Sequence, residues 1–318
     1  MGKIVFMFPG QGTQAVGMLK DICENYPVAM EVVQQADTLL DQPISQLIFE
    51  GPQSVLDLTV NTQPALLTIE VAAFRAIQSE GIQPDMLVGF SVGEWSAAVA
   101  ANVLCFEDAL RLVHLRAELM QQAVPVGEGR MLVIVGKDEL SVNRICEELT
   151  EYVAPSNFNY PGQITVSGTT KAIEVLEQMG EVGELVVTPL PVSIPSHCEM
   201  MRPAAEKMRD ALQNVVFQDP MWPIIMNVDG KLATKGSVIK ENLIQQLTKP
   251  VRFQQSTEYM LRNGVDTFIE LGPGKTLAGF VRKTARSVGV NVFSNRTDNM
   301  ENLREVLNTL STRRGEKH

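Results

Sequence analysis

The sequence predicts an α/β protein that carries a small ferredoxin-like domain inserted into a larger domain. At both ends of the chain, short apolar runs typical of buried strands alternate with stretches of helical periodicity, which indicates a sheet covered by helices. Between them, residues 128–195 predict the order βαββαβ, which is the ferredoxin-like arrangement. We therefore expect residues 1–127 and 196–318 to form one large α/β domain around this insertion.

The composition excludes several classes of protein. The chain has 318 residues, of which 45% are hydrophobic, so it can bury a large core. Its net charge of −10 disfavours nucleic acid as a partner. The four cysteines match neither a zinc spacing nor a CxxC pair, and no charge-free apolar run reaches the roughly 18 residues of a membrane span. We expect a cytoplasmic protein without a metal, a disulfide framework or a membrane segment.

The first part of the chain predicts a strand, several helices and a second strand. Residues 3–8, KIVFMF, form an apolar run that ends at Pro9 and Gly10, so we expect a buried strand followed by a glycine-rich loop. Helical periodicity covers residues 21–50, 64–79 and 108–122, and residues 87–90 predict the next strand.

The inserted segment and the remainder follow in the same way. In the insertion, we expect strands at residues 131–136, 152–157, 163–167 and 184–189, and helices at residues 138–151 and 170–179. After it, helices at residues 201–212, at 242–247 and from residue 300 alternate with strands at residues 224–228 and 267–271.

Ser91 stands between two glycines in the stretch GFSVG, after a predicted strand and before an Ala-rich run. This is the G-x-S-x-G pattern of a nucleophile elbow, in which small neighbours let a strand turn sharply into a helix with the serine at the bend. The helix N-terminus beside Ser91 would favour a developing negative charge. The alternative is that Ser91 only caps the helix.

A serine nucleophile needs a base, and the sequence contains only three histidines. His318 ends a charged tail, and His114 lies on a predicted helix, where a structural or surface role is the default. His197 follows two prolines that rule out a helix interior, in a loop just after the insertion, where it can close over a site between the domains. Elimination therefore favours His197 as the base.

Two glycine-rich stretches also suggest a nucleotide site. Residues 10–15, GQGTQA, match G-x-G-x-x-A after a strand, but the acidic residue expected at the end of a second strand is missing from a region of helical pattern. Residues 272–275, GPGK, lack the spacing of a phosphate-binding loop. The first loop can instead supply the backbone N–H of Gln11 to an oxyanion hole shared with the N–H of Val92.

Taken together, these motifs resemble the malonyl-CoA:acyl carrier protein transacylase family. The resemblance rests on FPGQGTQ at residues 8–14, GFSVGEW at 89–95, VSIPSHCEMMRPAA at 192–205 and ELGPGKTL at 270–277, and it spans nearly the whole chain. It implies an α/β-hydrolase-like large domain, with Ser91 as nucleophile and His197 as base. It also implies that the backbone carbonyl of Gln246 orients His197 and that Gln11 and Val92 form the oxyanion hole.

The resemblance further implies that Arg116 binds the substrate carboxylate. A guanidinium can hold a carboxylate in a bidentate manner that a neutral side chain cannot copy. By spacing alone, a structural salt bridge from Arg116 to a protein carboxylate is an equal alternative. The chain departs from the family at Phe90, where His is usual, and at Trp95, where Tyr is common.

The function implied is transfer of a malonyl group from malonyl-CoA to the phosphopantetheine thiol of an acyl carrier protein, through a malonyl-serine intermediate. The expected setting is fatty acid or polyketide synthesis, by a monomer that uses no cofactor. Because carrier proteins are acidic, docking would need a local basic patch on this acidic chain. The alternatives are an acyl hydrolase that edits carrier-bound thioesters, the malonyl transferase subunit of malonate decarboxylase, and a carrier-binding subunit with an inactive site.

Overall fold

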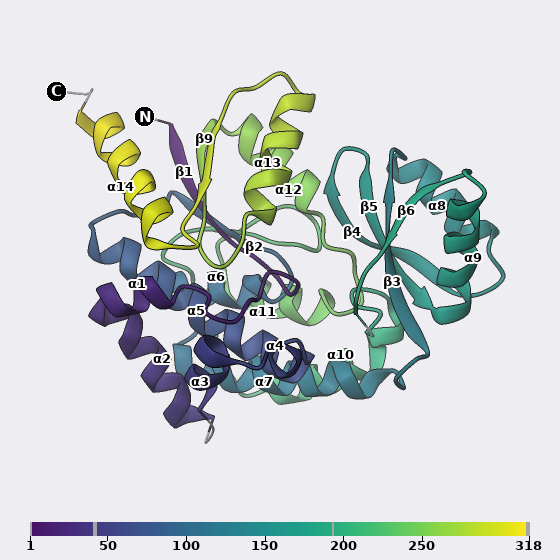
Figure 1. Cartoon of the computed structure of the whole chain (residues 1–318), viewed down its shortest axis with the longest axis horizontal. Helices are drawn as coiled ribbons and strands as arrows, with labels where there is room; N and C mark the ends of the chain where they lie inside the picture. Colours follow the sequence, from purple (N-terminus) through teal and green to yellow (C-terminus); the bar gives the residue numbers. More distant parts are fainter. Residues whose placement is uncertain (1, 41–42, 193, 316–318) are drawn as a thin grey trace.

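The computed structural model describes residues 2–40, 43–192 and 194–315, which build two β-sheets that lie side by side (Figure 1). The larger sheet has six strands and is built from both ends of the chain, and the smaller one has four strands from the middle. The predicted mixed α/β class is therefore confirmed.

The large sheet has the strand order β10-β9-β1-β2-β7-β8. Its strands are β1 (Lys3–Phe8), β2 (Met86–Gly89), β7 (Ile224–Ile225), β8 (Leu232–Ala233), β9 (Val265–Glu270) and β10 (Phe293–Arg296). All pairs are parallel except β7 with β8. Because β1 lies in the middle and both of its faces are covered, its sequence is a continuous apolar run rather than an alternating one.

Helices cover both faces of this sheet. Ile4, Phe6 and Phe8 of β1 point into a core shared with most of the helices, and Val5 and Met7 point to the opposite face. The first group comprises α1 (Lys20–Asn25), α2 (Pro27–Leu39), α3 (Ile44–Glu50), α4 (Gln53–Leu56), α5 (Thr59–Ser79), α6 (Gly93–Ala100), α7 (Phe106–Ala123), α10 (Arg202–Leu212), α11 (Gly236–Gln245) and α14 (Met300–Gly315). The second comprises α12 (Phe253–Arg262) and α13 (Thr276–Ser287).

The small sheet is antiparallel, with the order β4-β5-β3-β6. Its strands are β3 (Gly129–Val135), β4 (Val153–Tyr160), β5 (Gln163–Thr169) and β6 (Val186–Pro189), and its helices are α8 (Glu139–Glu148) and α9 (Thr170–Glu181). It has an apolar core of its own, centred on Leu132, Ile134 and Val166. The predicted chain order βαββαβ is present, with boundaries that differ by a few residues.

The structure differs from the expected elements in several places. The helical stretch at residues 21–50 contains three helices, because Pro27 starts α2 and Pro43 precedes α3. The strand expected at residues 224–228 has only two residues. The sequence pattern also did not indicate α4 and β8, nor α12, α13 and β10, which pack on or beside β9.

None of the helices within the described residues is long and apolar enough to cross a membrane.

Candidate active site

Ser91 lies at the sharp turn between β2 and α6, at the carboxyl end of the parallel strands. Its backbone has φ of 55°, in the left-handed region that non-glycine residues seldom adopt. The flanking glycines make this turn possible. A Cβ on Gly89 would lie 2.1 Å from the carbonyl carbon of Gly93, and one on Gly93 would lie 2.2 Å from the carbonyl oxygen of Phe8. The G-x-S-x-G spacing is therefore a steric requirement of this turn.

Ser91, His197 and Gln246 form a hydrogen-bonded line. The Ser91 Oγ lies 2.8 Å from Nε2 of His197, and Nδ1 of the same ring lies 2.7 Å from the backbone carbonyl of Gln246. Because a carbonyl can only accept, Nδ1 carries the proton and the Nε2 lone pair faces the serine hydroxyl. This tautomer can accept the serine proton.

His197 is buried and has an unusual backbone conformation. It is 2% exposed and has φ of 61°, a strained conformation for a histidine. Burial, together with the nearby charge of Arg116, lowers the pKa of His197 to about 4, against an ordinary value of 6.5. The imidazole is therefore neutral at physiological pH, as a base must be.

Arg116 reaches the same point from the middle of α7. Its Nη1 donates to the side-chain oxygen of Gln63 at 2.6 Å, and its Nη2 donates to the side-chain oxygen of Gln246 at 2.9 Å. Nη2 also lies 3.4 Å from the Ser91 hydroxyl. The guanidinium is fully buried, and burial lowers its pKa to about 10, so it stays charged at neutral pH. Among the described residues, no carboxylate forms an ion pair with it, unlike the structural salt bridge considered above.

The backbone N–H groups of Gln11 and Val92 have no acceptor within the described parts of the chain. Val92 follows the serine, and Gln11 belongs to the loop after β1. That loop packs directly on the elbow, because a Cβ on Gly10 would lie 2.7 Å from the carbonyl oxygen of Phe90. Two backbone donors without a described acceptor thus lie on the two loops that meet at the elbow.

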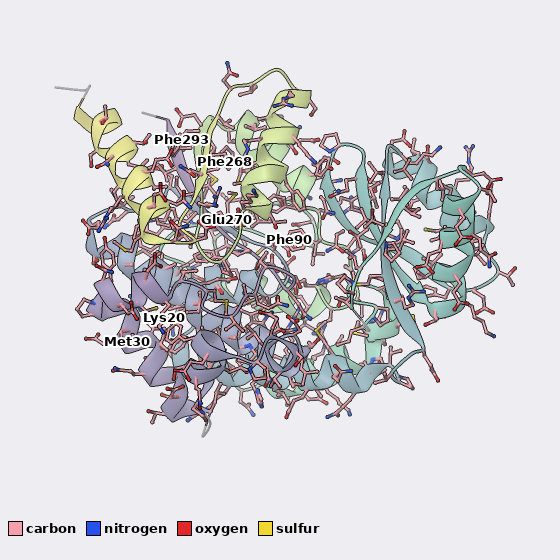
Figure 2. The ribbon with its side chains drawn as sticks, in the orientation of Figure 1. Lys20, Met30, Phe90, Phe268, Glu270 and Phe293 are labelled. Atoms are coloured by element: carbon pink, nitrogen blue, oxygen red, sulfur yellow. The ribbon has the colours of Figure 1, made fainter. Side chains whose placement is uncertain are left out.

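A cavity of about 300 Å³ opens at Ser91 between the two sheets. Its walls come from the elbow and the loop after β1 on one side and from β3, β4 and β5 on the other. The lining includes Ser91, His197, Gln63, Gln11, Asn157 and Thr165. Figure 2 shows Phe90 at this junction between the helix-covered sheet and the smaller one. The Phe90 ring packs against Phe253 and Phe280, so the residue that departs from the family pattern makes this wall aromatic.

A family model described as the acyl transferase domain matches residues 5–312. The chain belongs to the acyl transferase family. It is 45% identical to the malonyl CoA-acyl carrier protein transacylase of Bacillus subtilis over 290 residues, which cover 90% of this chain and 92% of that one. It is 43% identical to the enzyme of the same name from Escherichia coli K12, over 89% of this chain and 93% of that one.

Solved structures of similar proteins share the architecture. An acyl carrier protein S-malonyltransferase from Vibrio cholerae is 40% identical, with a TM-score of 0.90 over 96% of this chain and 99% of that one. A malonyl transacylase in complex with the acyl carrier protein of a type II polyketide synthase is 37% identical, with a TM-score of 0.92 over 96% and 99% of the two chains.

Three polar side chains of this acyl transferase site were missed from the sequence. Gln63 of α5 binds Arg116, as described above. Asn227, after β7, accepts the Ser91 N–H at 2.8 Å and donates to the carbonyl of Gly89 at 2.6 Å, so it clamps the strained elbow. Glu94, in the first turn of α6, accepts from the backbone N–H of Asn227 and from the side chain of Gln246. Only Glu94, directly after the motif, carried a sequence signal.

Burial raises the pKa of Glu94 to about 8, and its two hydrogen bonds and the charge of Arg116 act in the opposite direction.

The other sequence candidates lie elsewhere. His114 is part of α7 and lies 3.6 Å from Glu118, one turn further along the helix. His318 lies outside the described residues. The loop of Gly272 and Gly274 precedes α13, where Glu270 accepts the backbone N–H groups of Leu277 and Ala278. No cluster of metal ligands occurs in the part of the chain that the structure describes.

Proposed function

We propose that this acyl transferase moves a malonyl group from malonyl-CoA to the phosphopantetheine thiol of an acyl carrier protein, as the names of its relatives indicate. The observation that supports it most directly is the buried, charged guanidinium of Arg116 beside the hydroxyl of Ser91. A neutral acyl group has no use for such a cation, whereas the free carboxylate of malonate does.

In the first step, Nε2 of His197 accepts the proton of Ser91 as Oγ attacks the thioester carbonyl of malonyl-CoA. The carbonyl oxygen becomes an oxyanion, which the N–H groups of Gln11 and Val92 stabilise. The C–S bond then breaks, the imidazolium of His197 protonates the departing CoA sulfur, and malonyl-serine remains. The backbone carbonyl of Gln246 keeps Nδ1 protonated throughout.

The second step reverses the first with a different thiol. His197 accepts the proton of the phosphopantetheine thiol, and the sulfur attacks the malonyl-serine ester. The same two N–H groups stabilise the second oxyanion, and Ser91 leaves with the proton from His197. Every group that the two steps use belongs to the chain or to its substrates, so the proposal includes no cofactor.

Arg116 is proposed to hold the malonyl carboxylate in both steps. Malonate has only one methylene between its two carboxyl carbons, so an acyl group on Ser91 keeps its free carboxylate within a few ångströms of Oγ. The Nη2 of Arg116 lies 3.4 Å from that oxygen, and its Nε has no partner among the described residues. A carboxylate could thus replace weak contacts with charge-assisted hydrogen bonds.

A basic surface at the mouth of the cavity fits an acidic carrier protein. Residues 271–297 contain no Asp or Glu, although the whole chain carries a net charge of −10. Lys275, Arg282, Lys283 and Arg286 of this segment are exposed, and none forms an ion pair within the described residues. The same helix, α13, lines the cavity with Thr276, Leu277 and Phe280. We propose that the carrier docks on this face of α13 and extends its pantetheine arm to Ser91.

The finer architecture is part of the proposal. We propose that residues 1–127 and 196–318 form an α/β-hydrolase-like catalytic domain and that residues 128–195 form a ferredoxin-like domain. The serine elbow after a parallel strand and the antiparallel order β4-β5-β3-β6 support this division.

The test is mass spectrometry of the intact protein and its peptides after mixing with malonyl-, methylmalonyl- or acetyl-CoA, followed by addition of a phosphopantetheinylated carrier. We expect a malonyl adduct on the Ser91 peptide that disappears as the carrier gains malonyl. An adduct that decays to free malonate without charging any carrier would establish a hydrolase instead. No adduct with any of the three thioesters would refute the proposed transfer.

A further inference from the structure

Arg116 is a buried cation whose hydrogen-bond partners in the described structure are all neutral. Nη1 donates to Gln63 and Nη2 donates to Gln246 and Ser91, so amide and hydroxyl oxygens take the place of a carboxylate. A fully buried charge without compensation costs several kcal/mol. The groups that hold these neutral partners in place therefore matter to the site.

Glu94 is joined to Arg116 through an amide. Its side chain is 1% exposed, and Oε2 accepts a short hydrogen bond from the side-chain Nε2 of Gln246. The other end of the same amide, Oε1, accepts from Arg116 at 2.9 Å. The orientation of this amide is fixed by chemistry, because Arg116 can only donate and the carbonyl of Ser91, which also receives Nε2 at 2.9 Å, can only accept.

Both oxygens of Glu94 receive donors. Oε1 accepts the backbone N–H of Asn227 at 2.5 Å, and Oε2 accepts from Gln246. The Gln246 amide is thereby oriented with its oxygen toward the guanidinium.

Gln246 thereby controls two functional groups at once. Its side chain fixes Arg116, and its backbone carbonyl fixes the ring of His197 at 2.7 Å. We propose that Glu94 is a positioning residue that holds the Gln246 side chain and, through it, keeps Arg116 aligned with Ser91 for a carboxylated acyl group. This inference rests on the proposed function.

The indirect arrangement leaves Arg116 available to substrate. A guanidinium has five N–H donors, and the described contacts use three of them. A carboxylate bound directly to Arg116 would occupy the planar fork that the malonyl carboxylate needs. The Gln246 amide instead accepts a single N–H of Arg116 and is itself held by Glu94. The acyl preference of the site therefore depends on a residue that the substrate does not contact.

The test compares single-turnover acylation of Ser91 by malonyl-CoA and by acetyl-CoA. Glu94→Gln keeps the size of the side chain but places an amide N–H₂ against one of the two donors. We expect it to lower the rate with malonyl-CoA about 10- to 100-fold, the effect of one hydrogen bond to a charged group, and to lower the malonyl-to-acetyl ratio at least about fivefold. An equal loss with both thioesters, or no loss, would overturn the inference.

Gln246→Met removes the amide link and keeps the backbone carbonyl that orients His197. It should reproduce the malonyl-specific loss, and adding Glu94→Gln to it should cost less than about threefold more, because the link is already broken. Additive losses would show that Glu94 acts by another route. If Glu94→Gln does not fold, Gln246→Met still decides the question, because equal losses for the two acyl groups would contradict the link.

Glu70→Gln is the matched control. Glu70 is also fully buried, lies on α5 and makes no contact with Gln246 or Arg116. This substitution should leave the malonyl-to-acetyl ratio unchanged within about twofold, and a drop as large as that of Glu94→Gln would overturn a specific role for Glu94. Wild-type protein that forms no malonyl adduct would refute the proposed function itself, which distinguishes that failure from a failure of this inference.

Discussion

Lowering the pH from 7.5 to 5.5 should leave the acylation of Ser91 almost unchanged, because His197 remains a neutral base. Burial and the charge of Arg116 lower its pKa to about 4. At pH 5.5 a base with that pKa is about 97% neutral, whereas an ordinary histidine with a pKa of about 6.5 is only about 9% neutral. The two cases thus differ about tenfold in the expected rate, which rapid quenching after mixing with malonyl-CoA can measure as the mass of acylated protein.

The same shift predicts a loss of stability in acid. The folded-state pKa lies below the unfolded one, so between pH 6.5 and 4 the unfolded chain binds a proton that the native protein excludes. The contribution of His197 to the free energy of unfolding is fully present above pH 6.5. It declines by about 3 kcal/mol as the pH falls toward 4. His197→Gln should remove that part of the pH dependence of urea unfolding. A rate profile that falls with an inflection near pH 6.5 would refute the reasoning.

The remaining predictions concern substrate, turn and partner. Arg116→Ala should lower malonyl transfer about 100-fold and acetyl transfer far less, and an equal loss for both would contradict the carboxylate clamp. In urea titrations, Gly93→Ala should lower the free energy of unfolding by more than about 3 kcal/mol, because its Cβ would lie 2.2 Å from the backbone oxygen of Phe8. Gly279→Ala, whose Cβ would have no atom within 4 Å, should raise that free energy by roughly 0.5–1 kcal/mol. Lys283→Glu should raise the KM for the carrier protein about tenfold and leave the rate of acylation by malonyl-CoA unchanged. Lys20→Glu makes the same charge change on α1, far from the cavity (Figure 2), and should not change this KM. Equal effects of the two substitutions would place the carrier elsewhere.

The basic surface shows why net charge alone was a poor guide to the partner. The overall charge of −10 disfavours an acidic partner, yet residues 271–297 contain several Lys and Arg and no Asp or Glu. Its place beside the cavity depends on α13, which the sequence analysis missed. Charge complementarity is a local property of a surface, and the fold decides which surface lies next to the serine.

The sequence by itself determined the features that depend on neighbours along the chain. The buried strand at Lys3–Phe8 follows from an apolar run, and the turn at Ser91 follows from two glycines that no larger residue can replace. The order of the inserted segment followed from local periodicity. The positions of His197 and Arg116 beside Ser91 were expected only by elimination and by resemblance, since neither is close to the serine in sequence.

Only the tertiary structure decided how the polar groups around the serine are paired. Gln63 and Asn227 carry no signal in the sequence, and the hydrogen bonds that join Glu94 to Asn227 and Gln246 span 133 and 152 residues. Such bonds form because each buried donor or acceptor needs a partner, whichever part of the chain the fold brings to it. A local sequence pattern does not predict which distant residue becomes that partner. The link from Glu94 to Arg116 therefore follows only from the tertiary structure.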